Sequence, residues 1–356
     1  MTVKLEQLLV APDSSIRDVI ACIEGNSTGI ALVVDGDNRL IDTITDGDIR
    51  RGILDGIVLD SPVKALLKRR ASSPYPAPLT APVGTTNAEL LRMMNEYTLR
   101  HIPLVNDAGQ VVSIALISDL VKEFQPPLTA VVMAGGYGTR LHPLTKDIPK
   151  PMLPMGDRPL LELIMEQLQQ AGIQQVNIAT HHRAEKIVKH FGNGKAFGIE
   201  INYVTEDRPL GTAGALGLME TPKEPVLVIN GDVLTQVNFL SMLSFHREHG
   251  ADLTVAVRQY DLQVPYGVIE CDGPRVRQVN EKPLLGLLVN AGIYLLEPSV
   301  YHYIPKERFD MTDLIRRLLE DERPVVGFPI IEYWLDIGRY EEYEQAQKDI
   351  RNGGPF

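Results

Sequence analysis

The sequence predicts an α/β protein of two parts, a repeated α+β unit followed by a domain built on a mostly parallel sheet. Three observations support this fold class. The chain has 356 residues, 44% of them apolar, and is longer than one typical domain of roughly 100 to 200 residues. An internal repeat fills its first third. In the remainder, short apolar runs alternate with helical patterns, as in open sheets with helices on both faces.

The internal repeat has an offset of 71 residues and is clearest when 29–49 is laid over 100–120. In each copy we expect a strand, a turn, a second strand and a helix, with another helix upstream. Because a repeated unit of this size usually cannot bury its apolar face alone, we expect the two copies to pack against each other. The expected strands are 31–34, 40–45, 102–105 and 111–116, and the expected helices are 15–24, 46–54, 86–97 and 117–124.

Two consecutive prolines, Pro126 and Pro127, follow the repeat. They remove backbone donors and favour an extended spacer, so we place a domain boundary there. A further Pro-rich patch at 72–82 is expected to be a loop within the repeat. The expected parts are a repeat region at 1–124 with halves at about 1–62 and 63–124, a linker at 125–128 and a second domain at 129–350.

The second domain is expected to place its ligand at the carboxyl ends of its strands, as open parallel sheets do. The residues that directly follow each strand are therefore the first candidates for a site. The expected strands are 129–134, 176–180, 200–205 and 226–230, and the expected helices are 160–171, 184–191 and 239–249.

Composition argues against several classes of protein. A net charge of −11 argues against a nucleic-acid partner, which needs a basic face. No apolar run approaches the roughly 18 residues of a membrane span, and the N-terminus lacks the apolar stretch of a signal peptide. We therefore expect a cytoplasmic protein with no membrane partner. The two cysteines, Cys22 and Cys271, form no CxxC motif, so neither a disulfide nor a zinc site is expected.

A glycine-rich turn directly follows the first strand of the second domain, after Ala134, and consists of Gly135-Gly136-Tyr137-Gly138-Thr139-Arg140. Its glycines leave backbone N–H groups free to surround phosphate oxygens. It is not a P-loop, because no Gly-Lys-Ser or Gly-Lys-Thr follows, and Leu141 replaces the last glycine of a dinucleotide fingerprint. Further on, Lys150 stands between two prolines, so Arg140 and Lys150 can clamp a triphosphate from two directions.

The whole segment 131–154 closely resembles the signature of sugar-1-phosphate nucleotidylyltransferases. The alternative is a glycine hairpin with solvated cations. The resemblance implies a Rossmann-like domain in which a sugar 1-phosphate attacks the α-phosphorus of a nucleoside triphosphate and pyrophosphate leaves. It gives catalytic roles to Arg140, Lys150, Asp232, Lys282 and Asp336. The nucleotide-binding residues that it implies are Ala134, Gly135, Gly136, Gly138, Thr139, Arg140, Leu210, Gly211, Thr212 and Asp232.

The loop 206–215 resembles the part of this family that binds the nucleobase, the alternative being an ordinary helix start with small residues. The Pro-Leu-Gly-Thr-Ala-Gly sequence of this loop, together with the preceding repeat region, most resembles that of guanylyltransferases acting on mannose, heptose or glucosamine 1-phosphates. GTP is therefore the favoured substrate, and UTP, dTTP, CTP and ATP stay open. The sequence contains no hexapeptide repeats of an acyltransferase tail, so a bifunctional acetylating enzyme is not expected.

Two aspartates are the candidates for a magnesium site. Asp232 directly follows an apolar strand, and Asp336 follows Tyr333-Trp334-Leu335 near the C-terminus. Mg²⁺ prefers oxygen ligands and usually takes one or two carboxylates together with substrate phosphates. Either aspartate alone could be only a turn former. Together, in the order that the family has them, they are expected to hold a metal that bridges the phosphates.

Four residues resemble the family's contacts to the sugar phosphate. In 266–270 and 279–283, the resemblance assigns Gly267 and Glu281 to sugar hydroxyls and Lys282 to the phosphate, and it assigns Asn290 to a further hydroxyl. Lys282 by itself would be an ordinary surface lysine. His181 and His182, which follow the expected strand 176–180, have no third metal ligand at a suitable spacing. They are expected to be ordinary loop histidines and not metal ligands.

The repeat region resembles a pair of CBS modules, which work in tandem and often sense nucleotides. In that family a hydroxyl residue and an aspartate three positions later reach an adenine nucleotide, and Thr45 with Asp48 fits this spacing. The second copy keeps Asp119 but has Leu116 in place of the hydroxyl. The alternative is that both aspartates only favour a helix dipole. Nucleotide sensing and assembly both stay open, and a homo-oligomer is expected because CBS pairs commonly dimerise.

A function of another class is a non-catalytic sensor, in which a transferase-like domain only binds nucleotide while the CBS pair responds to its level. Loss of Arg140, Lys150 or Asp232 would favour that function, and all three residues are present. The sequence therefore favours an enzyme of nucleotide-sugar biosynthesis.

Overall fold

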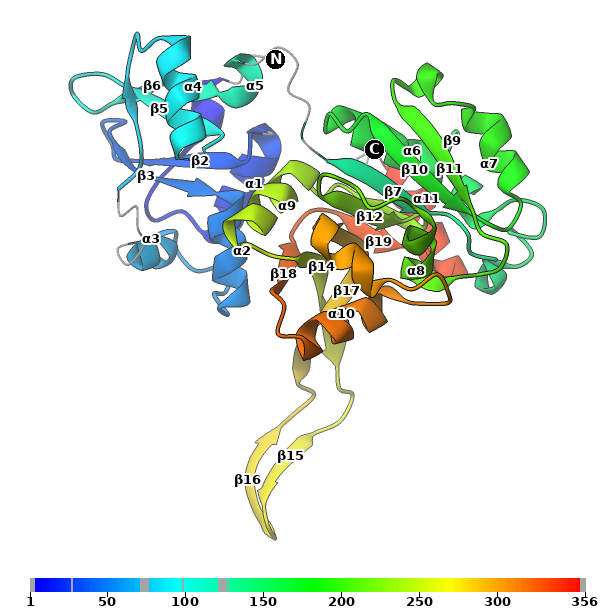
Figure 1. Ribbon diagram of the computed structural model, residues 1–356. Helices are drawn as coiled ribbons and strands as arrows, with labels where there is room; N and C mark the ends of the chain where they lie inside the picture. The colour runs from blue at the N-terminus through cyan, green and yellow to red at the C-terminus, as the bar shows by residue number, and fades with distance from the viewer. Residues whose placement is uncertain are drawn as a thin grey trace. The chain divides into compact units, whose positions relative to one another are not determined.

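The computed structural model describes residues 4–26, 28–70, 77–97, 99–120, 126 and 128–352. The chain divides into two compact units, Met1–Phe124 and Gln125–Phe356 (Figure 1). The predicted linker at 125–128 falls at this division, although two of its residues lie outside the described part of the chain. Residues 71–76, in and beside the Pro-rich patch, and 121–124 of the last expected helix of the repeat also lie outside it.

The first unit contains two three-stranded sheets with the same topology. In each sheet a short strand pairs in parallel with a second strand, which pairs antiparallel with a third. Matching elements begin 71 residues apart, for instance at Ile30 and His101, so the predicted repeat is confirmed. The elements are β1 (Leu9–Val10), α1 (Ile16–Asn26), β2 (Ile30–Val34), β3 (Leu40–Thr45), α2 (Asp46–Leu54), α3 (Lys64–Arg70), β4 (Ala81–Pro82), α4 (Asn87–Glu96), β5 (His101–Val105), β6 (Val111–Leu116) and α5 (Ile117–Leu120).

The two copies of the repeat contact each other through backbone and core. The amide of Leu40 donates to the carbonyl of Gly109 (3.1 Å), and the amide of Val111 donates to the carbonyl of Asn38 (3.0 Å). The expectation that each copy packs against the other is therefore confirmed. One buried apolar cluster takes residues from both copies, namely Leu8, Ile30, Leu32, Val34 and Val111.

The second unit is built on a seven-stranded sheet in the order β11-β10-β7-β12-β17-β14-β18. The first four strands are parallel, as are β14 and β18, whereas β17 is antiparallel to both of its neighbours. The prediction of a mostly parallel sheet is confirmed. The strands are β7 (Thr129–Met133), β10 (Gln175–Thr180), β11 (Glu200–Thr205), β12 (Val226–Asn230), β14 (Leu253–Gln263), β17 (Leu284–Leu296) and β18 (Val325–Ile330).

Helices cover both faces of this sheet (Figure 1) because successive side chains of a buried strand point to opposite faces. In β7, Ala130 and Val132 pack into one buried core and Val131 packs into the other. The first core includes residues of α6, α7, α9 and α11, and the second includes residues of α8 and α10. These helices are α6 (Leu160–Gln170), α7 (Ala184–Phe191), α8 (Gly211–Gly214), α9 (Phe239–Glu248), α10 (Met311–Glu320) and α11 (Tyr340–Arg351).

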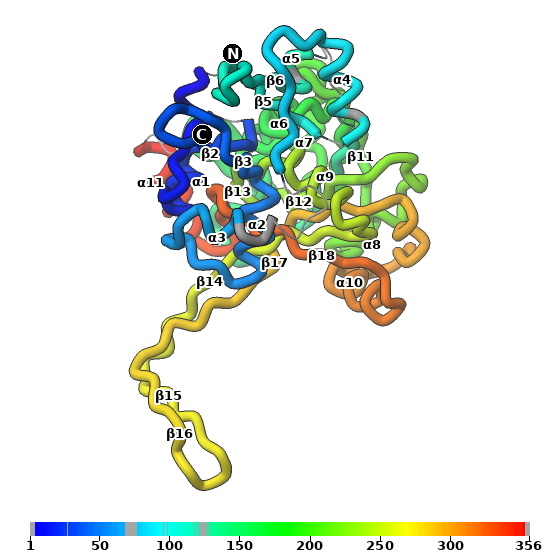
Figure 2. The backbone as a smooth tube through the Cα atoms, turned by 90° about the vertical axis from the view of Figure 1, so that its left-hand side faces the viewer, coloured from blue at the N-terminus to red at the C-terminus, as the bar shows by residue number. Residues whose placement is uncertain are grey.

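A long two-stranded ribbon extends from this sheet (Figures 1 and 2). Beyond Arg258, β14 pairs with β17 down to the pair of Gln263 with Leu284. The ribbon then continues into the hairpin of β15 (Val268–Asp272) and β16 (Arg275–Asn280). We name residues 259–288 the arm. The sequence did not predict this arm.

Candidate active site

The residues that follow the parallel strands gather at the carboxyl edge of the sheet, where the sequence predicted a site. After β7, the amide of Ala134 donates to the carbonyl of Ala179 at the end of β10 (2.8 Å). After β12, the amide of Gly231 donates to the carbonyl of Met133 at the end of β7 (2.9 Å). The glycine-rich turn thus begins between the ends of β10 and β12, which is where ligands bind in sheets of this kind.

The glycine-rich turn is folded against the segment that carries Lys150. Gly138 has φ 63°, the left-handed region that favours glycine. A Cβ at Gly138 would lie 3.0 Å from the Thr145 side chain and 3.1 Å from that of Lys150. The Thr145 hydroxyl also donates to the Gly138 carbonyl (2.7 Å). The turn continues into a short 3-10 helix, Thr139–Leu141, in which Arg140 is exposed.

Lys150 and Asp232 form an ion pair across this site. Lys150 begins a 3-10 helix, Lys150–Met152, that follows Pro149. Its Nζ lies 2.5 Å from Oδ2 of Asp232, and its side chain is only 13% exposed. The lysine predicted to bind the triphosphate and a carboxylate predicted to bind the metal are therefore brought together from positions far apart in the sequence.

A small antiparallel sheet places Asp336 beside Asp232. The strands β13 (Val233–Thr235) and β19 (Trp334–Asp336) pair so that Val233 lies opposite Asp336. The amide of Ile337 donates to the carbonyl of Asp232 (2.9 Å). Both predicted metal ligands therefore lie at the same end of one ladder.

The charges around Asp336 describe a site suited to a cation. Desolvation, and then repulsion from the Asp232 carboxylate, raise the pKa of Asp336 to about 6, while the charges of Lys150 and Arg140 oppose this rise. Because Asp336 is exposed, water moderates both the desolvation and the repulsion from Asp232. Among the described residues, no group of three or more His, Cys, Asp or Glu side chains forms a protein metal cage. Two carboxylates suit Mg²⁺, which keeps several non-protein ligands.

Glu342 is a charged residue of this site that the sequence reasoning missed. It lies in the first turn of α11, and its charge also raises the pKa of Asp336. Its Oε2 is buried and has no hydrogen-bond partner among the described residues. No local motif marks this glutamate, because it reaches the site only through the packing of α11.

A second missed group connects the glycine-rich turn to the base loop. The ring of His181 donates from Nδ1 to the carbonyl of Glu206 (2.8 Å) and accepts from the hydroxyl of Tyr137 at Nε2 (3.0 Å). A Cβ at Gly135 would lie 3.0 Å from Oε2 of Glu206, whose pKa is raised by burial. His181 was expected to be a plain loop histidine. Its place after β10, at the carboxyl edge, is the signal that could have found it.

The predicted base loop packs closely against 305–310. Gly211 has φ 83°, and a Cβ there would lie 2.5 Å from the Asp310 carboxylate. The Thr212 amide and hydroxyl donate to that same carboxylate oxygen, at 2.9 and 3.3 Å. The side chain of Leu210 is buried. The glycines therefore serve the close packing that was the alternative to base binding, and base contact stays a prediction.

The structure divides the four residues predicted to bind the sugar phosphate. Asn290 lies in β17 near the sheet, where its side chain accepts from the amide of Gly292 (3.0 Å). The other three residues flank the hairpin of the arm: Gly267 directly precedes β15, and Glu281 and Lys282 directly follow β16. The Glu281 carboxylate lies 2.9 Å from where a Gly267 Cβ would be. At about 3.3 Å per residue, roughly 26 Å of extended chain separates Lys282 from Asn290. These three residues are not brought to Asp232 of their own chain.

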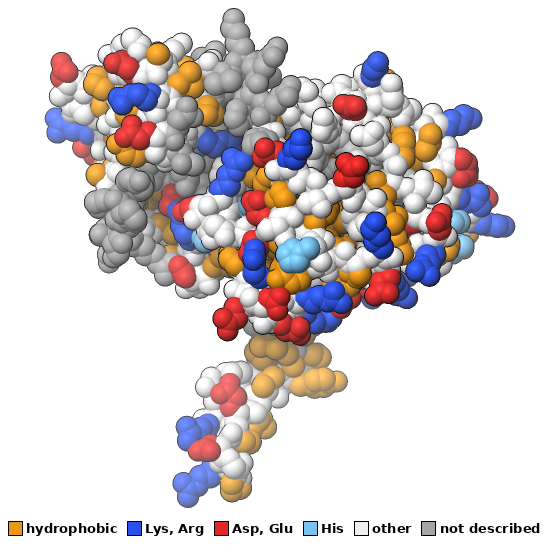
Figure 3. Space-filling model, in the orientation of Figure 1, with side chains coloured by type: hydrophobic (Ala, Val, Ile, Leu, Met, Phe, Trp, Pro, Cys, Tyr) orange, Lys and Arg blue, Asp and Glu red, His pale blue; other side chains and the backbone are white. Residues whose placement is uncertain are grey.

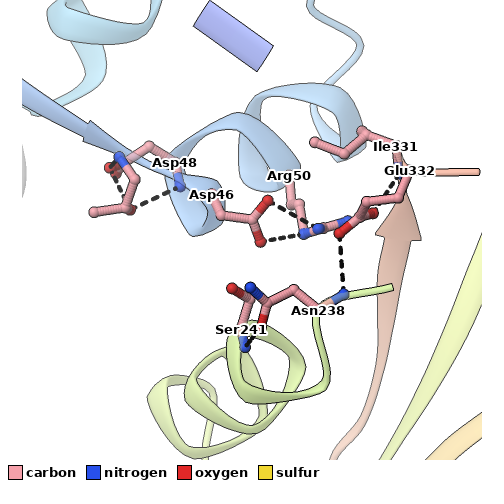
Figure 4. A network of polar contacts seen from close by, with 8 residues as sticks. Asp46, Asp48, Arg50, Asn238, Ser241, Ile331 and Glu332 are labelled. Carbon is pink, nitrogen blue, oxygen red and sulfur yellow. Dashed lines mark hydrogen bonds and ion pairs between the residues drawn. The ribbon is translucent and has the colours of Figure 1, made fainter. Parts of the chain in front are cut away.

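In the first unit, the residues predicted to bind an adenine nucleotide form the start of α2. Thr45 caps the helix, and its amide and hydroxyl both donate to the Asp48 carboxylate, at 2.8 and 2.7 Å. Figure 4 labels Asp48 at the start of this helix, together with Asp46 and Arg50. Asp46 forms a buried ion pair with Arg50 in the same helix (2.6 Å). Asp119 lies in the first turn of α5. The alternative to ligand binding, an aspartate in the first turn of a helix, is therefore present in both copies, and in the first copy Asp48 is also part of a capping box.

Two family models match the chain. The model described as nucleotidyl transferase matches residues 129–353, and the model described as CBS domain matches 6–55 and 73–126. No helix among the described residues is long and apolar enough to span a membrane.

Several curated proteins are similar to this chain. A mannose-1-phosphate guanyltransferase from Pichia angusta is 33% identical over 226 residues, which are 61% of this chain and 62% of that protein. A UTP–glucose-1-phosphate uridylyltransferase from Synechocystis is 32% identical over 245 residues, 63% of each protein. The chain thus spans less than two thirds of the length of these relatives.

Solved structures are similar to part of this chain. A putative glucose-1-phosphate thymidylyltransferase from Bacillus anthracis, in complex with a sucrose, is 25% identical with a TM-score of 0.53, covering 63% of this chain and 96% of that one. HddC from Yersinia pseudotuberculosis is 26% identical with a TM-score of 0.50, covering 62% of this chain and 99% of that one. These similarities agree with the mostly parallel sheet described above.

Proposed function

The chain belongs to the nucleotidyl transferase family and carries a pair of CBS domains, as its motifs predicted, and we propose that it joins a nucleoside monophosphate to a sugar 1-phosphate. An oxygen of the sugar 1-phosphate attacks the α-phosphorus of a nucleoside triphosphate. The bond from the α-phosphorus to the oxygen that bridges it to the β-phosphorus breaks, and pyrophosphate leaves with the electron pair. The products are a nucleoside-diphosphate sugar and pyrophosphate.

The contact between Lys150 and Asp232, beside the glycine-rich turn, is the observation that carries this proposal. The nucleophile is already an anion, so the transfer needs alignment and neutralised charge more than acid–base chemistry. Lys150 and Arg140 supply positive charge to the triphosphate from two directions. Backbone N–H groups of 135–139 would bind its oxygens, and 210–212 would bind the base.

Mg²⁺ is the metal that we assign to Asp232 and Asp336. Burial, and then the neighbouring Asp232 carboxylate, raise the pKa of Asp336, and a bound cation would favour the charged form of both carboxylates. The donors are hard oxygens, as Mg²⁺ prefers. When bound, the ion neutralises the charge that develops on the phosphates.

GTP and mannose 1-phosphate are the substrates to test first. The relative from Pichia angusta is named for mannose 1-phosphate and guanyl transfer, and the base loop has the form expected for GTP. The relative from Synechocystis is named for UTP and glucose 1-phosphate, which makes that pair the second choice.

The test of this function is a matrix of substrates. The full chain with Mg²⁺ is incubated with each of GTP, UTP, dTTP, CTP and ATP against mannose, glucose and glucosamine 1-phosphates, and pyrophosphate release is measured. We expect release that needs both substrates and is fastest with GTP. Nucleotide binding without release in any combination would contradict the enzyme and favour the nucleotide sensor.

The first unit completes the proposal. We assign 1–124 to the CBS pair, 125–128 to a linker and 129–350 to the transferase domain of a cytoplasmic homo-oligomer. An adenine nucleotide is the ligand that we assign to the first module, at Thr45 and Asp48, and Asp119 is the corresponding position of the second. The Thr45 hydroxyl already donates to the Asp48 carboxylate and accepts from the Asp48 amide. A ligand bound there would have to replace the first of these hydrogen bonds or form additional ones with the same two residues.

A further inference from the structure

The part of the arm next to the sheet, 259–263 paired with 284–288, has one apolar face. Tyr260 lies opposite Leu287, and Leu262 lies opposite Leu285. Because opposite residues share a face, as do residues two apart along a strand, these four side chains form one stripe. Each of them is between 44% and 55% exposed. Figure 3 shows hydrophobic side chains gathered where the arm leaves the rest of its unit.

An isolated ribbon with such a face is poorly suited to water. Two-stranded hairpins alone are marginally stable, and contiguous exposed apolar patches mark interaction surfaces. On the other face of the ribbon, Leu284 and Leu288 are also more than half exposed. Among the described residues, the sheet pairing of β14 beyond Arg258 is with β17 alone. The arm therefore needs a partner surface.

The arm also carries three residues of the proposed transferase site, and the present inference rests on that proposed function. Gly267, Glu281 and Lys282 lie past the apolar stripe, roughly 26 Å of extended strand from Asn290. The carboxyl edge of the same chain has the cations for a triphosphate and the two carboxylates for a metal. Among the described residues, the lysine assigned to the sugar phosphate is not there.

We propose that the arm docks on a second copy of this chain and completes the sugar-phosphate site of that copy. Lys282 of one chain then serves the site formed by Asp232 and Asp336 of the other, where its positive charge meets two carboxylates and the substrate phosphate. The exchange is reciprocal, as a two-fold interface requires. A second copy is the partner that offers both a site in need of an arm and an identical apolar stripe to cover.

A mixed-chain experiment tests this proposal directly. Asp232→Asn removes a carboxylate from the core and leaves the arm intact, whereas Lys282→Ala alters the arm and leaves the core intact. The two chains are co-expressed with different tags, and the hybrid is isolated by two affinity steps. Lys223→Ala, at an exposed loop lysine, replaces Lys282→Ala in the control hybrid.

Reciprocal arms predict complementation. Each variant alone should lose at least about tenfold in kcat/KM for the sugar 1-phosphate, and the isolated hybrid should recover about half of the wild-type value because one of its two sites has both parts intact. A hybrid no more active than the single variants would show that the arm serves its own chain and would overturn the proposal, as would a normal rate for Lys282→Ala alone. Failure of the proposed function differs, since the wild-type chain itself would then release no pyrophosphate.

The stripe offers an independent test without active-site changes. Leu285→Gln with Leu287→Gln should lower both the dimer fraction in sedimentation velocity and the turnover, and both losses should shrink as protein concentration rises. Leu319→Gln, an exposed leucine of α10, is the matched control. A stripe variant that stays dimeric and fully active would contradict the docking of the arm on a second copy.

Discussion

The carboxyl edge of the sheet and the arm present their predicted residues in opposite ways. At the edge, Lys150, Asp232 and Asp336 come from segments far apart in the sequence and meet through a 2.5 Å ion pair and one short ladder. On the arm, Glu281 and Lys282 lie next to each other in the sequence and are carried away from that cluster. Parallel strands bring distant residues together at one edge of the sheet, whereas a ribbon that extends beyond its sheet carries its residues away from that edge.

The largest expected effect is at the edge. Asp232→Asn should lower the turnover number about 100-fold or more, because it removes both the partner of Lys150 and a metal ligand, the scale typical of losing one electrostatic stabiliser. The rate is measured as pyrophosphate release at saturating substrates. Asp157→Asn, in the turn between two short strands, is the matched control and should keep the normal rate. Near-normal turnover of Asp232→Asn would show that the carboxyl edge of the sheet is not the catalytic site.

Lys150→Ala should also cost about 100-fold, since a partly buried point charge is lost from the triphosphate. Here the Michaelis constant for the nucleoside triphosphate should rise as well, while that for the sugar 1-phosphate changes little. Exposed Lys146, four residues earlier, supplies the control Lys146→Ala. If Lys150→Ala changed the Michaelis constant only for the sugar 1-phosphate, the assignment of Lys150 to the triphosphate would be contradicted.

Lys282→Ala should be milder toward the nucleotide and should act on the other substrate. We expect about tenfold loss in kcat/KM for the sugar 1-phosphate, as for a partly solvent-exposed charge contact, with nucleotide binding unchanged. Titration of both substrates separates the two effects. An equal loss toward both substrates would mean that the arm acts on the whole fold and not on one ligand.

Within the edge, two glycines give a finer comparison. Gly138→Ala should destabilise the second unit by about 1 to 2 kcal/mol, because φ is positive and the new Cβ would crowd Thr145 and Lys150. Gly136→Ala meets no atom within 4 Å and should be nearly neutral. Urea unfolding followed by the fluorescence of Trp334, the single tryptophan of the chain, measures both. Equal stabilities would contradict the packing of the turn.

The smallest expected effect concerns pH at the start of β14, at the end of this strand away from the arm. Hydrogen bonds from Arg323 hold the pKa of Asp252, the residue before β14, below its usual range. A lowered carboxylate pKa gives stability that is present above the unfolded pKa of about 3.9 and is lost as pH falls through the folded value. The urea midpoint should therefore fall below about pH 4, and less steeply in Asp252→Asn. The exposed pair of Arg277 with Asp272 on the arm should give no such difference.

Much of the fold could be predicted because its signals are local. The 71-residue repeat and the alternation of apolar runs with helical patterns both follow from the period of apolar residues. The glycine-rich turn and Lys150 were found through a motif that keeps its residues close in sequence. Glu342 and the contacts of His181 were missed because they depend on which elements pack together.

The arm was missed for a related reason. Residues 253–296 have the apolar character of strands, and such a pattern indicates a face to be covered without saying which chain covers it. The base loop shows the same limit from the other side. Its glycines match a base-binding motif, yet in the structure they also allow close packing against 305–310. Base binding and close packing both favour glycine at these positions, so the sequence alone does not distinguish them.

The central claim is nucleotidyl transfer to a sugar 1-phosphate, and the fate of the α-phosphorus tests it most directly. GTP labelled with ³²P at the α-phosphate is incubated with mannose 1-phosphate, Mg²⁺ and the full chain, and the products are separated by chromatography. We predict that the label appears in a nucleoside-diphosphate sugar in amounts equal to the pyrophosphate released, and that Asp232→Asn lowers the rate of both about 100-fold or more. Label that stays in GTP, or that leaves as GMP or GDP without a sugar, would contradict the account.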